Sequence, residues 1–136
     1  MEKTLMILKP DTLKRKVAGR ILAKVEEAGF AIRRLELVHL DAERAGRFYA
    51  VHAGKPFMDE LVAYMTSGPC IPMVLEADDA IPRLRELMGA TNPADAAPGT
   101  IRAEFGVDIQ TNSVHGSDSP ASAAVEIPFF FSGEAV

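Results

Sequence analysis

The residues best suited to chemistry stand together between Asn112 and Pro120, where His115 is followed by Gly116, Ser117 and Asp118. An imidazole titrates near neutral pH and can act as a nucleophile or as a base. Asn, Ser and Asp side chains favour turns, so we predict that His115 lies on a loop. A glycine beside the ring would leave one of its faces open to a large reactant, and backbone amides in such a loop can bind anions. The alternative is an ordinary surface histidine, which is the commoner role of this residue type.

A helix is predicted directly after this segment. Ser119 is a favourable cap, and Pro120 suits the first helical position because its missing N–H costs nothing there. Glu126 falls about two turns into the helix, and helical side chains lean toward the N-terminus, so its carboxylate is expected to orient His115. The expected apolar face of this helix consists of Ala121, Ala124 and Val125.

Composition limits the class of protein. The 136 residues fit one domain spanning 1–136, and the single cysteine, Cys70, excludes an internal disulfide. The net charge of −4 disfavours general attraction to nucleic acid, so a phosphate site must be a local cluster of cations. No apolar run approaches the ~20 residues that span a bilayer, and no leader-like segment precedes the first strand. We therefore expect a cytoplasmic protein without a membrane partner.

Hydrophobic patterning predicts alternating strands and helices. The predicted strands cover 4–8, 30–40 and 70–75, with a short further strand that delivers Asn112 and His115. Helices are predicted over 17–28, from Asp41 through Phe48, Tyr49 and His52, over 57–65, over 78–89 and, for one turn, over 101–105. The long loop 90–99 is expected to be functional.

Phosphoryl transfer would need a phosphate cradle of an unusual kind. The sequence contains no Gly-rich loop of the type that ends in Gly-Lys-Ser/Thr, and no protein-kinase signature. The candidate groups are Lys9, Arg85, Arg102 and the Thr91 hydroxyl, which are scattered along the chain. Taken singly, each has an ordinary alternative: a strand-end lysine, a solvated ion pair at Arg85, or unremarkable loop residues.

The motif Asn112-x-x-His115-Gly116-Ser117-Asp118 resembles the active-site signature of the nucleoside diphosphate kinases. The resemblance extends over nearly the whole chain, from Lys9-Pro10-Asp11 to Phe129-Phe130-Phe131. It implies an α+β fold of the ferredoxin-like sandwich type. In this fold a four-stranded antiparallel sheet has helices packed on it, which we expect on one face.

The resemblance also implies a nucleotide site. The positions that match the family's site are occupied by Lys9, Tyr49, Phe57, Arg85, Thr91, Arg102, Asn112 and Ser117. In that site the Arg85, Thr91 and Arg102 side chains would hold phosphates. Lys9 and Asn112 would hold the sugar hydroxyls, with Lys9 also near the transferred group. Phe57 would stack on the base, bordered by His52 and Leu61, and Tyr49 would position the incoming group.

The implied reaction is ping-pong transfer of a γ-phosphoryl group from a nucleoside triphosphate to a diphosphate, through a phosphohistidine at His115 oriented by Glu126 and Ser117. The implied cofactor is Mg²⁺, held by the substrate phosphates and not by protein side chains. The implied assembly is a homotetramer or a homohexamer, with the short chain end after Phe131 favouring a tetramer. Two other hypotheses remain open: a histidine phosphocarrier that acts on proteins, and a regulatory protein that binds nucleic acid.

Overall fold

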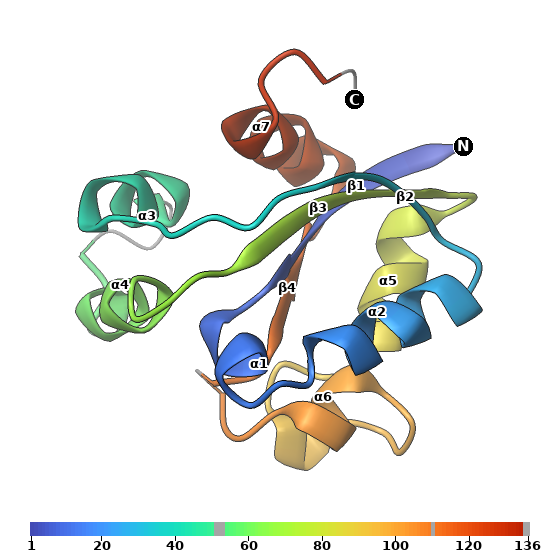
Figure 1. Ribbon diagram of the computed structural model, residues 1–136, viewed down its shortest axis with the longest axis horizontal. Helices are drawn as coiled ribbons and strands as arrows, with labels where there is room; N and C mark the ends of the chain where they lie inside the picture. The colour runs from blue at the N-terminus through green and yellow to red at the C-terminus, as the bar shows by residue number, and fades with distance from the viewer. Residues whose placement is uncertain (51–53, 110, 135–136) are drawn as a thin grey trace.

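The computed structural model describes residues 1–50, 54–109 and 111–134 (Figure 1). Its strands are β1 (Glu2–Leu8), β2 (Ala31–Leu35), β3 (Ile71–Ala77) and β4 (Val114–Gly116). Its α-helices are α1 (Pro10–Lys14), α2 (Ala18–Glu27), α3 (Ala42–Phe48), α4 (Met58–Met65), α5 (Ala80–Met88), α6 (Ile101–Phe105) and α7 (Pro120–Phe130). A 3₁₀ turn covers Pro93–Asp95, within the loop that leads to α6.

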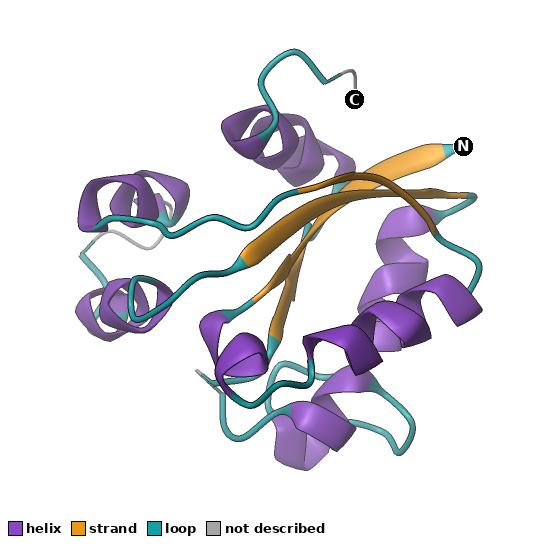
Figure 2. Ribbon diagram, in the orientation of Figure 1, coloured by secondary structure: helices purple, strands orange, loops and turns teal. Residues whose placement is uncertain are grey.

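The strands form one antiparallel sheet in the order β2-β3-β1-β4 (Figure 2). β1 is a central strand and its apolar run is buried from Leu5 to Leu8, which explains why it reads as a continuous hydrophobic segment. Together with the two helical crossovers, this order confirms the predicted ferredoxin-like fold.

Helices cover both faces of the sheet, so the expectation of helices on one face is wrong (Figure 1). Alternate residues of β1 point to opposite sides, as the pleat requires. Met6 and Leu8 pack with α2, α5 and α6, whereas Leu5 and Ile7 pack with α3, α4 and α7. The sheet is therefore the middle layer of a three-layer structure.

β2 is shorter than predicted. It spans only Ala31–Leu35 at an edge of the sheet, it is mostly exposed, and its register shifts between Ile32 and Arg34. Beyond it the N–H of Glu36 still donates to the backbone oxygen of Pro72, and an isolated bridge joins Val38 to Cys70. Apolar residues continue past the strand, and this is why the sequence predicted strand as far as residue 40.

Helix starts were predicted better than helix faces. Asp41 and Ser119 cap α3 and α7, accepting from the backbone N–H of Arg44 and Ser122. Asp79 makes no side-chain cap and has a left-handed backbone conformation. The predicted apolar face of α7 is wrong: its buried residues are Ala123, Ile127 and Phe130.

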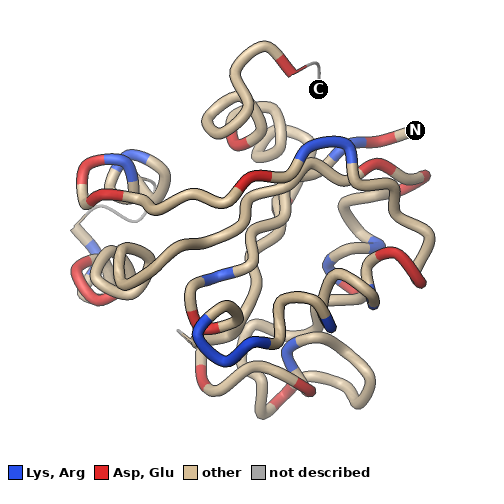
Figure 3. The backbone as a smooth tube through the Cα atoms, viewed as in Figure 1, with Lys and Arg blue, Asp and Glu red and all other residues tan. Residues whose placement is uncertain are grey.

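Charged residues of both signs are interspersed over the molecule (Figure 3). Among the described residues, no helix is both long and apolar enough to cross a membrane.

Candidate active site

His115 lies in strand β4, so its prediction as a loop residue is wrong. The residue pairs with Ile7 of the central strand β1, and its side chain is about one-fifth exposed. Gly116 does not open a face of the ring; instead it permits close packing. A Cβ atom at this position would lie 2.5 Å from Cε of Met88 and 3.2 Å from Cδ2 of Leu84, both on α5. The missing side chain therefore lets the sheet edge approach that helix.

Glu126 of α7 meets the imidazole as predicted. Nε2 of His115 lies 2.8 Å from Oε1 of Glu126, and the same oxygen accepts a hydrogen bond of 3.0 Å from the Ser117 hydroxyl. An ionised carboxylate can only accept, so Nε2 carries the proton and Nδ1 keeps its lone pair. Ser117 is itself fixed by Leu5, whose backbone N–H donates to the Ser117 hydroxyl oxygen and whose backbone oxygen accepts from the Ser117 N–H. The ring is therefore held in one tautomer, in which Nδ1 is the nitrogen that keeps its lone pair.

Aromatic side chains pack beside the ring of His115. Phe48 contacts it edge to face, with ring centroids 5.4 Å apart, and the Tyr49 ring lies 6.4 Å away. Tyr49 is 5% exposed, and burial strongly raises the pKa of its hydroxyl. The orientation of the imidazole is thus fixed by packing against these aromatic rings as well as by the hydrogen bond to Glu126.

Lys9 and Asn112 form a buried pair on neighbouring segments. Nζ of Lys9 donates to Oδ1 of Asn112 at 2.8 Å, and Nδ2 of Asn112 donates to the backbone oxygen of Thr91 at 3.0 Å. Burial, and secondarily the positive charge of Arg102, lower the pKa of Lys9 to about 8, while Asp11 opposes the shift. Lys9 therefore remains mostly protonated at neutral pH, at a desolvation cost.

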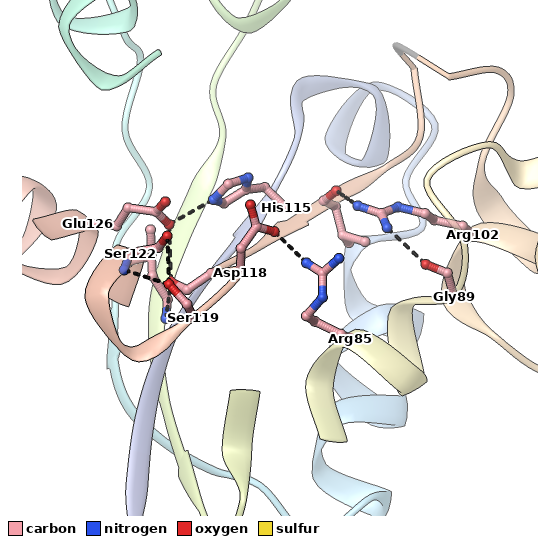
Figure 4. Close-up of polar contacts among 11 residues, drawn as sticks. Arg85, Gly89, Arg102, His115, Asp118, Ser119, Ser122 and Glu126 are labelled. Atoms are coloured by element: carbon pink, nitrogen blue, oxygen red, sulfur yellow. Dashed lines mark hydrogen bonds and ion pairs between the residues drawn. The ribbon is translucent and has the colours of Figure 1, made fainter. Parts of the chain in front are cut away.

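Arg102 and Arg85 lie on the other side of His115 from Glu126 (Figure 4). The Arg102 guanidinium donates to the backbone oxygens of Gly89 and Val114, at 2.9 Å each. Its buried Nε makes no hydrogen bond. Arg85 pairs with the exposed carboxylate of Asp118, which supports the alternative of a solvated ion pair without excluding a phosphate contact.

These cations are close enough to disfavour one another's charge. Arg102 lowers the pKa of Lys9, and burial together with Arg85 lowers the pKa of Arg102 to about 10. Gathering like charges in a partly dry site is unfavourable unless an anion offsets them. An oriented imidazole beside such a cluster is suited to reaction with a phosphorylated ligand.

The remaining predicted residues are more peripheral. Phe57 stands at the start of α4 with 43% of its surface exposed, and Thr91 is exposed in the loop after α5. Leu61 packs against the core. His52 lies outside the described residues.

Sequence reasoning missed two groups that contact this site. One is Phe48, which was assigned only to a helix. The other is a network in which the buried Asp11, close in the chain to Lys9, bonds to the half-buried Tyr64 and to the buried Ser113, which follows Asn112. Asp11 stood inside the quoted Lys-Pro-Asp motif, and that position was the one available signal.

Comparison with known proteins assigns the family. Residues 2–136 match the family model described as nucleoside diphosphate kinase. The chain belongs to the nucleoside diphosphate kinase family. The nucleoside diphosphate kinase of Dinoroseobacter shibae is 58% identical over 133 residues, covering 98% of this chain and 95% of that relative. The enzyme of Ruegeria pomeroyi is 56% identical, with the same coverage of both chains.

Solved nucleoside diphosphate kinases share the fold. The Aquifex aeolicus enzyme matches with a TM-score of 0.95 and 47% identity, covering 97% of this chain and 96% of that one. A Halobacterium salinarum enzyme, solved in complex with CDP, matches with a TM-score of 0.93 and 42% identity, covering 96% of this chain and 88% of that one. The chain is thus a nucleoside diphosphate kinase, a phosphotransferase that acts on nucleotides.

Proposed function

We propose that this nucleoside diphosphate kinase transfers the γ-phosphoryl group of a nucleoside triphosphate, typically ATP, to a nucleoside diphosphate by a ping-pong reaction at His115. In the cell this reaction would balance nucleoside triphosphate and deoxynucleoside triphosphate pools. The main support is the orientation of the imidazole: Glu126 holds Nε2, and Nδ1 is left as the nucleophile beside a cluster of cations.

The nucleotide would lie across the cations. Arg85, Thr91 and Arg102 bind its phosphates, Lys9 and Asn112 bind the sugar hydroxyls, and Phe57 stacks on the base. Stacking contributes ~1–3 kcal/mol per base with little regard to base identity, so purine and pyrimidine nucleotides are both accepted. Binding of phosphate would release Arg85 from Asp118, its present partner.

The reaction proceeds in two like steps. The Nδ1 lone pair attacks the γ-phosphorus, the bond to the bridging oxygen breaks, and the diphosphate leaves with that electron pair. A terminal oxygen of a second diphosphate then attacks the phosphohistidine and restores the imidazole. Glu126 stabilises the positive charge that develops on the ring, with Ser117 supporting the carboxylate. Lys9 acts near the transferred group, and Tyr49 positions the incoming one.

Mg²⁺ is the proposed cofactor. Among the residues that the structure describes, no three His, Cys, Asp or Glu side chains are grouped so as to hold a metal. This donor set fits an ion that arrives on the substrate phosphates, where Mg²⁺ commonly binds. When bound, the ion neutralises phosphate charge alongside the arginines. We further propose a cytoplasmic homotetramer or homohexamer whose ligands are nucleoside tri- and diphosphates.

The deciding experiment is incubation with ATP labelled at the γ-phosphate, followed by acid and alkali treatment. A phosphohistidine is stable to alkali and lost in acid. We expect such labelling in the parent protein and none in a folded His115→Ala variant. Labelling that persists in the variant would refute the assignment of His115. Rapid discharge of the phosphoenzyme by free diphosphates supports a kinase, whereas discharge only by a protein would support a phosphocarrier.

A further inference from the structure

A network of hydrogen bonds centred on Asp11 adjoins the pair of Lys9 and Asn112. Asp11 is on the short helix α1 and is 6% exposed. Its Oδ1 accepts from the Tyr64 hydroxyl of α4, and its Oδ2 lies 3.1 Å from the Ser113 hydroxyl. Arg15 lies 3.4 Å from the same oxygen. Burial raises the pKa of Asp11, while the contacts with Ser113 and Arg15 oppose that shift.

Ser113 links this network to the site. Its φ of +73° is a left-handed backbone conformation, which residues with side chains seldom adopt unless their surroundings impose it. The Ser113 hydroxyl also reaches the backbone oxygen of Phe105, at the end of α6, and its own backbone oxygen accepts from the N–H of Lys9 at 2.8 Å. The strained residue is therefore held from three directions.

The backbone conformation of Ser113 affects the preceding residue, Asn112. Asn112 precedes Ser113 in the chain, so the unusual backbone of Ser113 sets the direction from which the Asn112 side chain meets Lys9. Lys9 is two residues before Asp11, and its Nζ lies 6.0 Å from the centroid of the Tyr64 ring. Residues 9 and 11 thus hold residues 112 and 113 through side-chain and backbone bonds.

We propose that Asp11 is a positioning residue that, through Ser113 and Tyr64, holds Asn112 and Lys9 in the geometry that recognises the sugar hydroxyls of the nucleotide. This inference rests on the proposed function, which gives Lys9 and Asn112 that role. In the described part of the chain, the hydrogen bonds of the Asp11 carboxylate reach Tyr64, Ser113 and Arg15 and not His115, Arg85 or Arg102. We therefore place its effect on sugar recognition and not on the imidazole.

The test compares the affinities for ADP and for 2′,3′-dideoxy-ADP in the parent and in Asp11→Asn. This substitution keeps the side chain's size and removes its charge and one acceptor. Loss of a hydrogen-bond geometry costs about two- to tenfold in affinity. We expect that loss for ADP, with dideoxy-ADP affinity unchanged, so that the ratio between the two ligands narrows. The exposed Asp78, in the turn before α5, supplies the matched control: Asp78→Asn should preserve the ratio.

Tyr64→Phe provides a second, milder variant, because it removes only the hydroxyl on Asp11. It should narrow the same ratio, and it decides the matter if Asp11→Asn fails to fold. The proposal would be overturned if the affinities for ADP and dideoxy-ADP fell equally, or if neither affinity fell. A residue with a merely structural role would not distinguish the two sugars.

The proposed function is tested separately by phosphorylation of His115 with phosphoramidate, a donor that has no sugar. Asp11→Asn should lose more rate with ATP than with phosphoramidate, because only ATP carries a sugar, whereas Lys9 lies near the transferred group with either donor. An equal loss of rate with both donors would contradict a role in sugar recognition. Absence of ATP-dependent labelling in the parent would refute the proposed function itself.

Discussion

At the scale of single residues, the bond between His115 and Glu126 fixes the orientation of the imidazole, and in the proposed reaction this orientation would set the direction of attack. Because Glu126 takes Nε2 and shares its oxygen with Ser117, the imidazole cannot present either nitrogen at random. The pair lies in a part-buried place, where a charge-assisted hydrogen bond contributes more than it would in water.

Glu126→Gln keeps the size of the side chain and removes its charge. A charge-assisted hydrogen bond contributes ~1.5–3 kcal/mol, so the rate of phosphohistidine formation should fall about ten- to a hundredfold. Nucleotide affinity should stay nearly constant, because the proposed binding residues are elsewhere. Single-turnover phosphorylation by ATP, with diphosphate affinity measured in parallel, gives the two values. An unchanged rate would show that another group orients His115.

Lys9 should give the reaction an alkaline limit. Its pKa of about 8 means that the ammonium loses its proton as the pH rises through that value, and its attraction for the nucleotide is lost with the charge. We expect kcat/KM, which reports on the free enzyme, to fall above about pH 8 and the decline to vanish in Lys9→Met.

The stability of the fold should rise with pH over the range in which Lys9 titrates, whereas kcat/KM falls. The pKa in the folded chain lies below the ordinary value of 10.5, so the unfolded chain binds more protons between these two values. The parent should therefore gain stability relative to Lys9→Met as the pH rises from about 8 to 10.5. The unfolding free energies of the two proteins, measured with urea, give this difference. A flat difference would contradict the depressed pKa.

At the scale of elements, the approach of β4 to α5 depends on Gly116. Gly116→Ala would place a Cβ 2.5 Å from the Met88 side chain, and overpacking of this kind costs ~1–3 kcal/mol. Thermal unfolding should report that loss, together with slower phosphorylation because His115 is the neighbouring residue. Gly19→Ala on α2 is the control: its Cβ meets nothing within 4 Å, so it should not destabilise the fold. Equal melting temperatures for the two variants would refute the packing explanation.

Phe57 occupies the N-cap position of α4, and its side chain makes no capping hydrogen bond. Because 43% of the residue is exposed, Phe57→Ala should change the melting temperature only slightly. If the exposed ring stacks on the base, the variant should lose ~1–3 kcal/mol of binding free energy, by similar amounts for purine and pyrimidine diphosphates. Calorimetric titration with one nucleotide of each kind measures this. A loss confined to one base would indicate hydrogen bonding to the base edge.

At the scale of the whole molecule, the chain carries a net charge of −4 in spite of its local group of cations. This net negative charge should disfavour association with a long nucleic acid, so we expect no retention of double-stranded DNA even at about 50 mM salt. A gel-shift assay tests this, with Arg85→Ala as a variant that should lose nucleotide affinity without altering the DNA result. Tight, salt-sensitive DNA binding would revive the regulatory hypothesis.

The sequence alone determined the parts of this protein that depend on local chemistry. Asp41 and Ser119 marked helix starts because a side-chain oxygen can bond the first free N–H groups of whichever helix follows. The apolar run before Lys9 identified a buried strand, and the spacing from His115 to Glu126 anticipated their hydrogen bond. The family resemblance supplied the remaining site residues and the sheet topology.

Only the tertiary structure decided the rest. A helix that is apolar on most sides, such as α7, gives no periodic signal, so packing against β1 selected Ala123 and Ile127 for burial in place of the predicted face. Strand register brought Lys9, at the end of β1, next to Asn112, and the closeness of α5 and α6 made the cations lower one another's pKa. The Asp11 network joins residues more than 100 positions apart, and such pairings become visible only when the sheet has been assembled.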